Sequence, residues 1–122
     1  MPSDDLVIVD MQGVTVVTFR GTSILDALAV DAIGRTLYDL VDQRACRKIV
    51  LDFAQVRMIS SQMVGALINL HKKSQAIKGK VVLCGLRPDV SRIFRITNLH
   101  KLLSFADDEQ KALSEFGVFP QA

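Results

Sequence analysis

Two runs rich in β-branched residues lie near the start of the chain, over residues 6–11 and 14–20. Gln12 and Gly13 stand between the runs, and such a pair is typical of a hairpin turn. In the second run successive side chains alternate, which indicates a strand with two distinct faces. The pattern therefore predicts a β-hairpin over this part of the chain.

From residue 24 to residue 43 the apolar residues recur at helical spacing instead. Asp26 and Asp31 near the start have the sign that stabilises the positive end of a helix dipole. The pattern predicts a first helix. The apolar side chains expected on its buried stripe are Ile33, Leu37, Leu40 and Val41, with Leu25 and Leu28 leading into it.

The next apolar run, KIVLDF over residues 48–53, is short and is followed by turn signals, as is typical of a buried parallel strand. Asp52 near its end is interpreted as a carboxylate that binds backbone amides of the turn, with a site residue as the alternative. A second helix is predicted over Ser61–Ala76, and Lys72, Lys73 and Gln75 are expected to end it in solvent. Its buried stripe is expected to contain Met63, Leu67, Leu70 and Ser74.

Three further elements follow Gly79, beginning with a strand at KVVLCG. Pro88 suits the first turn of a third helix, which is predicted over Pro88–Ile96. Residues 102–105 predict a short last strand. Asp107 with Gln110 then gives a capping signal for a fourth helix that ends at Gly117.

Strands that alternate with helices imply right-handed crossovers. The expected fold class is therefore α/β, with a mixed, largely parallel sheet of about four to five strands and four to five helices. At 122 residues, the chain is predicted to be one domain over 1–122.

Composition narrows the function. The net charge is only +2 and the seven aromatic residues are not interleaved with basic ones, so nucleic-acid binding is not expected. No apolar stretch approaches the ~20 residues of a membrane span, and no signal peptide is recognisable. A cytoplasmic location is therefore predicted.

Candidate chemistry is sparse. His71 and His100 have no partners at metal-ligand spacing, and Cys84 in an apolar run is interpreted as a buried structural thiol. The segment CGLRPD has one glycine, too few for a nucleotide fingerprint, and no GxSxG motif supports hydrolysis. We therefore predict no metal, no cofactor and no catalytic residues.

The segment RMISSQMVG, residues 57–65, places two serines at the predicted start of the second helix. Ser60 and Ser61 are favoured residues for capping that helix. A phosphate here would also be stabilised by the helix end, and its charge would disrupt docking of an acidic partner. Capping and a phosphorylation switch explain the serines equally well.

The segment from IVLDFAQVRMISSQMVG through GKVVLCGLRP to IFRITNLHKLL resembles the core of a STAS domain, the family of bacterial anti-sigma factor antagonists. The resemblance covers most of the chain. It implies a compact α/β module that binds a kinase-type anti-sigma factor or a serine kinase of the same system. In the family, phosphorylation of one serine at the helix start releases that partner.

The usual family turn reads Asp-Ser-Ser/Thr-Gly-Leu-Gly, and its second hydroxyl residue accepts the phosphate. In the gapless register, Ser60 takes the Asp position, Ser61 the first serine, and Gln62 the acceptor position. Met63 then replaces the first glycine. A one-residue slip would instead put Ile59 at the Asp and Ser61 at the acceptor, but it misplaces Gly65.

Three hypotheses follow, of which the first two rest on the resemblance and the third is an enzyme, against which the missing phosphate loop argues. The first is a binding module whose phosphorylation candidates are Ser61 and Ser60. The second is a phosphorylation-independent scaffold subunit of a signalling or lipid-transport complex, and the third is a nucleotide hydrolase that uses Asp52 and Ser61. The residues expected to bind a partner are Met58, Ile59, Ser60, Ser61, Gln62, Met63, Gly65, Arg87 and Arg92.

Overall fold

A computed structural model describes residues 6–20, 23–24 and 27–118 of the chain. The predicted hairpin is confirmed, because β1 (Leu6–Met11) and β2 (Val14–Phe19) pair antiparallel. At the turn the Gly13 amide donates to Asp10 Oδ1 at 3.0 Å, and Gly13 adopts a φ of 89°. Glycine reaches this left-handed conformation without steric cost.

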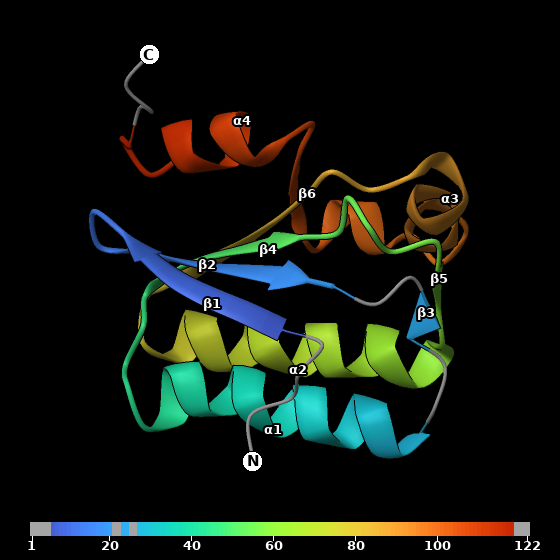
Figure 1. Cartoon of the computed structure of the whole chain (residues 1–122), viewed down its shortest axis with the longest axis horizontal. Helices are drawn as coiled ribbons and strands as arrows, with labels where there is room; N and C mark the ends of the chain where they lie inside the picture. The colour runs from blue at the N-terminus through green and yellow to red at the C-terminus, as the bar shows by residue number, and fades with distance from the viewer. Residues whose placement is uncertain (1–5, 21–22, 25–26, 119–122) are drawn as a thin grey trace.

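The main sheet has five strands in the order β1-β2-β4-β6-β7 (Figure 1). The strands after the hairpin are β4 (Lys48–Asp52), β6 (Lys80–Cys84) and β7 (Ser104–Ala106). Each of them pairs in parallel with the strand before it in this order. The prediction of a mixed, largely parallel sheet is therefore confirmed.

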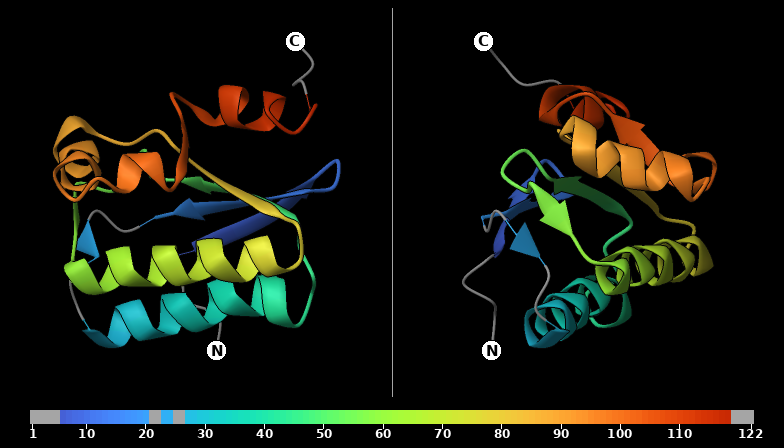
Figure 2. Two further views of the ribbon diagram at one scale, coloured as in Figure 1. Left: turned by 180° about the vertical axis from the view of Figure 1, so that it is seen from behind. Right: turned by 90° about the vertical axis from the view of Figure 1, so that its right-hand side faces the viewer.

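Four helices cover this sheet. The helices α1 (Ala27–Asp42) and α2 (Ser61–Ala76) lie side by side across one face, as both views of Figure 2 show. The short α4 (Glu109–Ser114) lies across the other face, and α3 (Pro88–Ile96) lies at one end of the sheet. The predicted bounds of α2 and α3 are confirmed.

The larger core fills the space between the sheet and the pair α1 and α2. The predicted stripe of α1 is confirmed, since Ile33, Leu37, Leu40 and Val41 are all buried. The prediction for Leu28 is wrong: its side chain is 80% exposed. Leu28 stands about 200° around the helix from the buried Val30, at roughly 100° per residue. Leu25 and Asp26 lie outside the described residues.

The smaller core lies on the opposite face, where Ala112 and Leu113 of α4 pack against the sheet. The predicted cap of α4 is off by one residue. Asp108 is the N-cap, and its Oδ1 accepts a hydrogen bond from the Lys111 amide at 2.8 Å. Asp107 instead forms an ion pair with Lys111 Nζ at 2.9 Å, so its carboxylate faces outward from the helix start.

Three short elements differ from the sequence prediction. The last strand begins two residues later than predicted, because the 3-10 helix η1 (Leu99–Lys101) precedes it. The strands β3 (Ser23–Ile24) and β5 (Met58–Ile59) were not predicted, and they pair in parallel as a separate two-stranded sheet. Two residues are too few to show an alternating pattern.

Candidate functional site

The turn that carries the serines is anchored at the end of β4. The Phe53 amide donates to the Cys84 carbonyl at 2.9 Å, and the Val56 amide donates to the Phe53 carbonyl at 2.9 Å. The side chains of Phe53 and Val56 are completely buried. The turn therefore leaves the sheet in a fixed direction before β5 leads it into α2.

Ser60 is the N-cap of α2. It has extended backbone angles, φ −89° and ψ 162°, and its Oγ accepts a hydrogen bond from the Met63 amide at 3.1 Å. Ser61 is the first residue of the helix, is exposed, and has no capping bond among the described residues. The prediction that both serines cap the helix is thus confirmed for Ser60 and wrong for Ser61.

Replacing Ser60 by Ala is expected to lower the free energy of unfolding by about 1 kcal/mol, because the Met63 amide loses its acceptor. Ser61→Ala is the matched control and should change stability by less than about 0.5 kcal/mol. Urea unfolding of the three proteins measures both values. Equal losses in the two variants would show that Ser60 is not the cap.

Gln62 links the start of α2 to α1. Its Nε2 donates a hydrogen bond to Asp31 Oδ1 at 3.0 Å, and both residues are exposed. The two residues are 31 positions apart, and the sequence analysis did not predict this contact. The bond holds the Gln62 side chain against the neighbouring helix.

The predicted partner-binding residues of the turn separate into two groups by burial. Met63 is fully buried and Ile59 is only 7% exposed, so these side chains belong to the core. Met58 is 53% exposed, and Gln62, four residues later, is also exposed. At Gly65 an added Cβ would meet no atom within 4 Å, which shows open space above the helix.

Arg87 contacts the turn, whereas Arg92 does not. The Nε of Arg87 donates to the Ala54 carbonyl at 3.2 Å, just after β4 ends. Arg92 lies farther along α3, and no hydrogen bond or ion pair connects it to the turn within the described residues. Arg87 alone of the two therefore has a contact with the turn.

Asp52 has the structural role that was favoured from the sequence. Its Oδ1 accepts a hydrogen bond from the Ala54 amide at 2.9 Å. Glu109 is its neighbour: burial first, then a hydrogen bond to Asp52 and its charge, raise the pKa of Glu109. Glu109 thus binds its proton more tightly in the folded chain than in the unfolded chain. Its contribution to stability is fully present below the ordinary pKa of a glutamate and is lost as the pH rises through the raised pKa.

The expected buried thiol is also present. Cys84 is fully buried, and burial, followed by the charge of Asp52, raises the pKa of Cys84 to about 12. A thiol with this pKa is protonated near neutral pH and is a poor nucleophile. Cys84 therefore contributes to the core and not to chemistry.

The histidines remain apart from any ligand cluster. Burial lowers the pKa of His71, and its Nε2 is buried with no hydrogen-bond partner. His100 lies in η1, which follows α3 along the chain. Among residues 6–20, 23–24 and 27–118, no three His, Cys, Asp or Glu side chains gather as metal ligands would.

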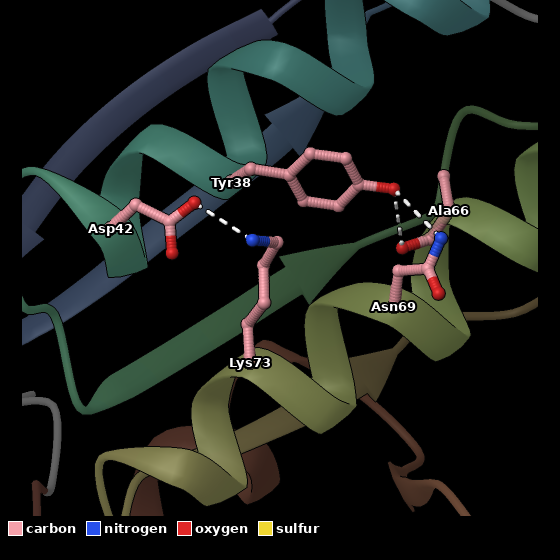
Figure 3. A network of polar contacts seen from close by, with 5 residues as sticks. All are labelled: Tyr38, Asp42, Ala66, Asn69 and Lys73. Carbon is pink, nitrogen blue, oxygen red and sulfur yellow. Dashed lines mark hydrogen bonds and ion pairs between the residues drawn. The ribbon is translucent and has the colours of Figure 1, made fainter.

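Polar contacts fix α2 against α1 (Figure 3). The Tyr38 hydroxyl donates to the Ala66 carbonyl at 3.5 Å, and Asn69 Nδ2 donates to the Tyr38 oxygen at 3.5 Å. One turn farther on, Lys73 Nζ lies 2.8 Å from Asp42 Oδ2. Lys73 lies in the last turn of α2 with its side chain 38% exposed, as predicted, and its ion pair with Asp42 is a surface contact to the neighbouring helix.

Comparison with known proteins agrees with this architecture. The sequence model of the STAS domain matches residues 5–112. The anti-sigma F factor antagonist of Paenibacillus polymyxa is 26% identical over 107 residues, which cover 88% of this chain and 90% of that protein. Anti-sigma factor antagonists are non-catalytic regulators, and membership of their family implies protein partners.

Two solved structures show the same fold. The structure of an anti-sigma factor antagonist from Mycobacterium paratuberculosis has a TM-score of 0.81 at 21% identity, covering 97% of this chain and 100% of that one. The Bacillus cell fate determinant SpoIIAA in its phosphorylated form has a TM-score of 0.71 at 19% identity, covering 91% and 98%. No helix in the described part of the chain is long and apolar enough to cross a membrane. The match over residues 5–112 shows that the chain belongs to the STAS domain family of anti-sigma factor antagonists.

Proposed function

We propose that the chain is a regulatory module that binds a kinase-type anti-sigma factor in the cytoplasm. The docking surface comprises the exposed residues Met58, Ser61 and Gln62 and the half-buried Gly65, with Arg87 beside the turn. The observation that carries this proposal is the exposed start of α2, where Ser61 has no internal partner among the described residues. The names of the relatives as anti-sigma factor antagonists support the choice of partner.

Ser61 is the proposed phosphate acceptor. The Oγ of Ser60 is already engaged with the Met63 amide, whereas Ser61 is exposed in the first turn of a 16-residue helix. The free amides and the dipole at that end stabilise a phosphate. The phosphate adds about 1.5 to 2 negative charges at neutral pH, and these charges would repel an acidic partner surface.

One observation favours a phosphorylation-independent scaffold as the second candidate. In the gapless register Gln62 stands where the family carries its acceptor, and an amide cannot be phosphorylated. Its hydrogen bond to Asp31 at 3.0 Å gives Gln62 a structural role of its own. In the scaffold model the same surface binds its partner constitutively, and Ser61 contacts the partner without being phosphorylated.

Ser61→Asp separates the two candidates. In the switch model the added charge is expected to weaken binding of the purified anti-sigma factor of the same system by at least about tenfold, a loss of ~1.4 kcal/mol. Ser61→Ala should bind as the wild type does. Isothermal titration calorimetry measures the affinities, and mass spectrometry after incubation with that partner and ATP locates any phosphate.

The control places an equal charge change at the other end of the same helix, as Gln75→Asp, where binding should not change. Unchanged binding by Ser61→Asp, with no phosphate on Ser61, would reject the switch and support the scaffold. Failure of the wild type to bind the anti-sigma factor at all would reject the docking proposal itself.

A further inference from the structure

A hollow of about 380 Å³ opens beside α3 at the carboxyl end of the main sheet. Its wall includes Leu86, which follows β6, together with Ala106 and Asp107 at the end of β7. In open α/β sheets, ligands commonly bind outside the carboxyl ends of the strands. The volume lies within the roughly 300–1,000 Å³ of small-molecule sites.

Part of the lining of this hollow is aromatic. Phe94 and Phe105 line it, with ring centroids 5.4 Å apart and planes inclined at 65°. Phe94 is buried, while Phe105 is only partly buried and still presents surface. Phe105, which packs on Phe94, therefore supplies the accessible aromatic surface, and this surface suits a flat apolar group that gains burial and ring contact.

The rim of the hollow carries polar groups that are not used elsewhere in the described structure. Ser91, Arg95 and His100 line it, and no side-chain hydrogen bond or ion pair engages any of the three within the described residues. Asp107 also lines the hollow, but its carboxylate forms an ion pair with Lys111 at 2.9 Å. Arg95 is therefore the charge left available for a ligand.

A second, more open hollow of about 700 Å³ adjoins the first along α3. It shares Ser91 and Arg95 with the first and adds Arg92 and Asp89. Arg95 follows Arg92 by three residues and Ser91 by four, so its side chain neighbours both of them on the helix surface. The guanidinium groups of Arg92 and Arg95 thus line the same opening, together with the carboxylates of Asp89 and Asp107.

We propose that this hollow binds a small organic anion in which a phosphate or carboxylate group is attached to an aromatic body. The aromatic body would lie against Phe105, which packs on Phe94, and the anionic group would lie toward Arg95 and Ser91. A guanidinium binds both phosphate and carboxylate in bidentate geometry, which explains why the class includes both groups. The site is separate from the residues of the proposed docking surface.

The probe for this site is 1-naphthyl phosphate, which joins the two required parts. Two-dimensional NMR of the full chain is expected to show saturable shifts of the amides of Ser91, Phe94, Arg95 and Phe105. Inorganic phosphate and 2-naphthalenemethanol each supply one part only and should bind at least about tenfold more weakly. 1-Naphthoate tests whether a carboxylate serves as well as a phosphate.

Two variants make the test specific. Arg95→Ala removes the available cation and should weaken the probe by about tenfold, whereas Ser91→Leu fills the hollow and should abolish binding. Lys101→Ala is the matched control, because Lys101 is an exposed cation of η1 that does not line the hollow. Absence of shifts in the wild type, or affinities that neither variant changes, would overturn the proposal. Dispersed spectra of the variants verify that each is folded.

Discussion

Replacing Phe53 by Ala is expected to lower the free energy of unfolding by about 3–5 kcal/mol, the usual cost of truncating a buried phenylalanine. Phe53 is completely buried and stacks on Phe19, with ring centroids 4.6 Å apart and planes inclined at 20°. The ring fills the core below the point where β4 ends and the serine turn begins. Its loss leaves a cavity that the surrounding sheet cannot close.

Denaturant unfolding of Phe53→Ala against the wild type measures this effect. Ile96→Ala is the control, because the Ile96 side chain is 73% exposed and its truncation should cost less than about 0.5 kcal/mol. A loss below about 1 kcal/mol for Phe53→Ala would show that the site relaxes around the cavity and that the Phe53 ring does not fix the turn.

Replacing Gly79 by Ala is expected to destabilise the chain by about 1–3 kcal/mol, the range found for overpacked sites. An added Cβ would lie 2.8 Å from the Arg47 carbonyl oxygen and 2.7 Å from the Oγ of the buried Ser74. The carbonyl belongs to backbone that accepts a hydrogen bond from the Lys80 amide at 2.7 Å, so it cannot move without disturbing the start of β6.

Gly65→Ala is the matched opposite case. Nothing lies within 4 Å of the added Cβ, and the residue stands inside a helix, where Ala is favoured over Gly by about 1 kcal/mol. The variant should therefore be more stable than the wild type. Thermal unfolding of both glycine variants gives the comparison, and a loss of stability in Gly65→Ala would contradict the open space described above α2. If Gly65→Ala is stable but no longer binds the partner, the glycine serves the docking surface.

The elements with strong periodicity could be read from the sequence. The bounds of α2 and α3 followed from one apolar stripe and one proline, and the strands β4 and β6 followed from their continuous apolar runs. The pairing of β3 with β5 could not be read, because two-residue strands are defined by a partner far away in the chain. The shifted cap of α4 shows the same limit, since Asp107 and Asp108 are equally good caps by type.

The sequence predicted where the candidate site lies, but not which role each of its residues has. The sequence alone does not distinguish the roles of two adjacent serines. The backbone angles at Ser60 show that its hydroxyl accepts the hydrogen bond from the Met63 amide. The burial of Met63 followed from the apolar stripe, yet it was also counted as a partner-binding residue. The Gln62–Asp31 contact joins two helices, and no local pattern encodes it.

The pair β3–β5 stands apart from the five-stranded sheet and has only two residues in each strand. Few hydrogen bonds must break to open it, so its opening free energy lies far below that of global unfolding. We therefore expect the amides of Met58 and Ile59 to exchange with solvent faster than those inside β4.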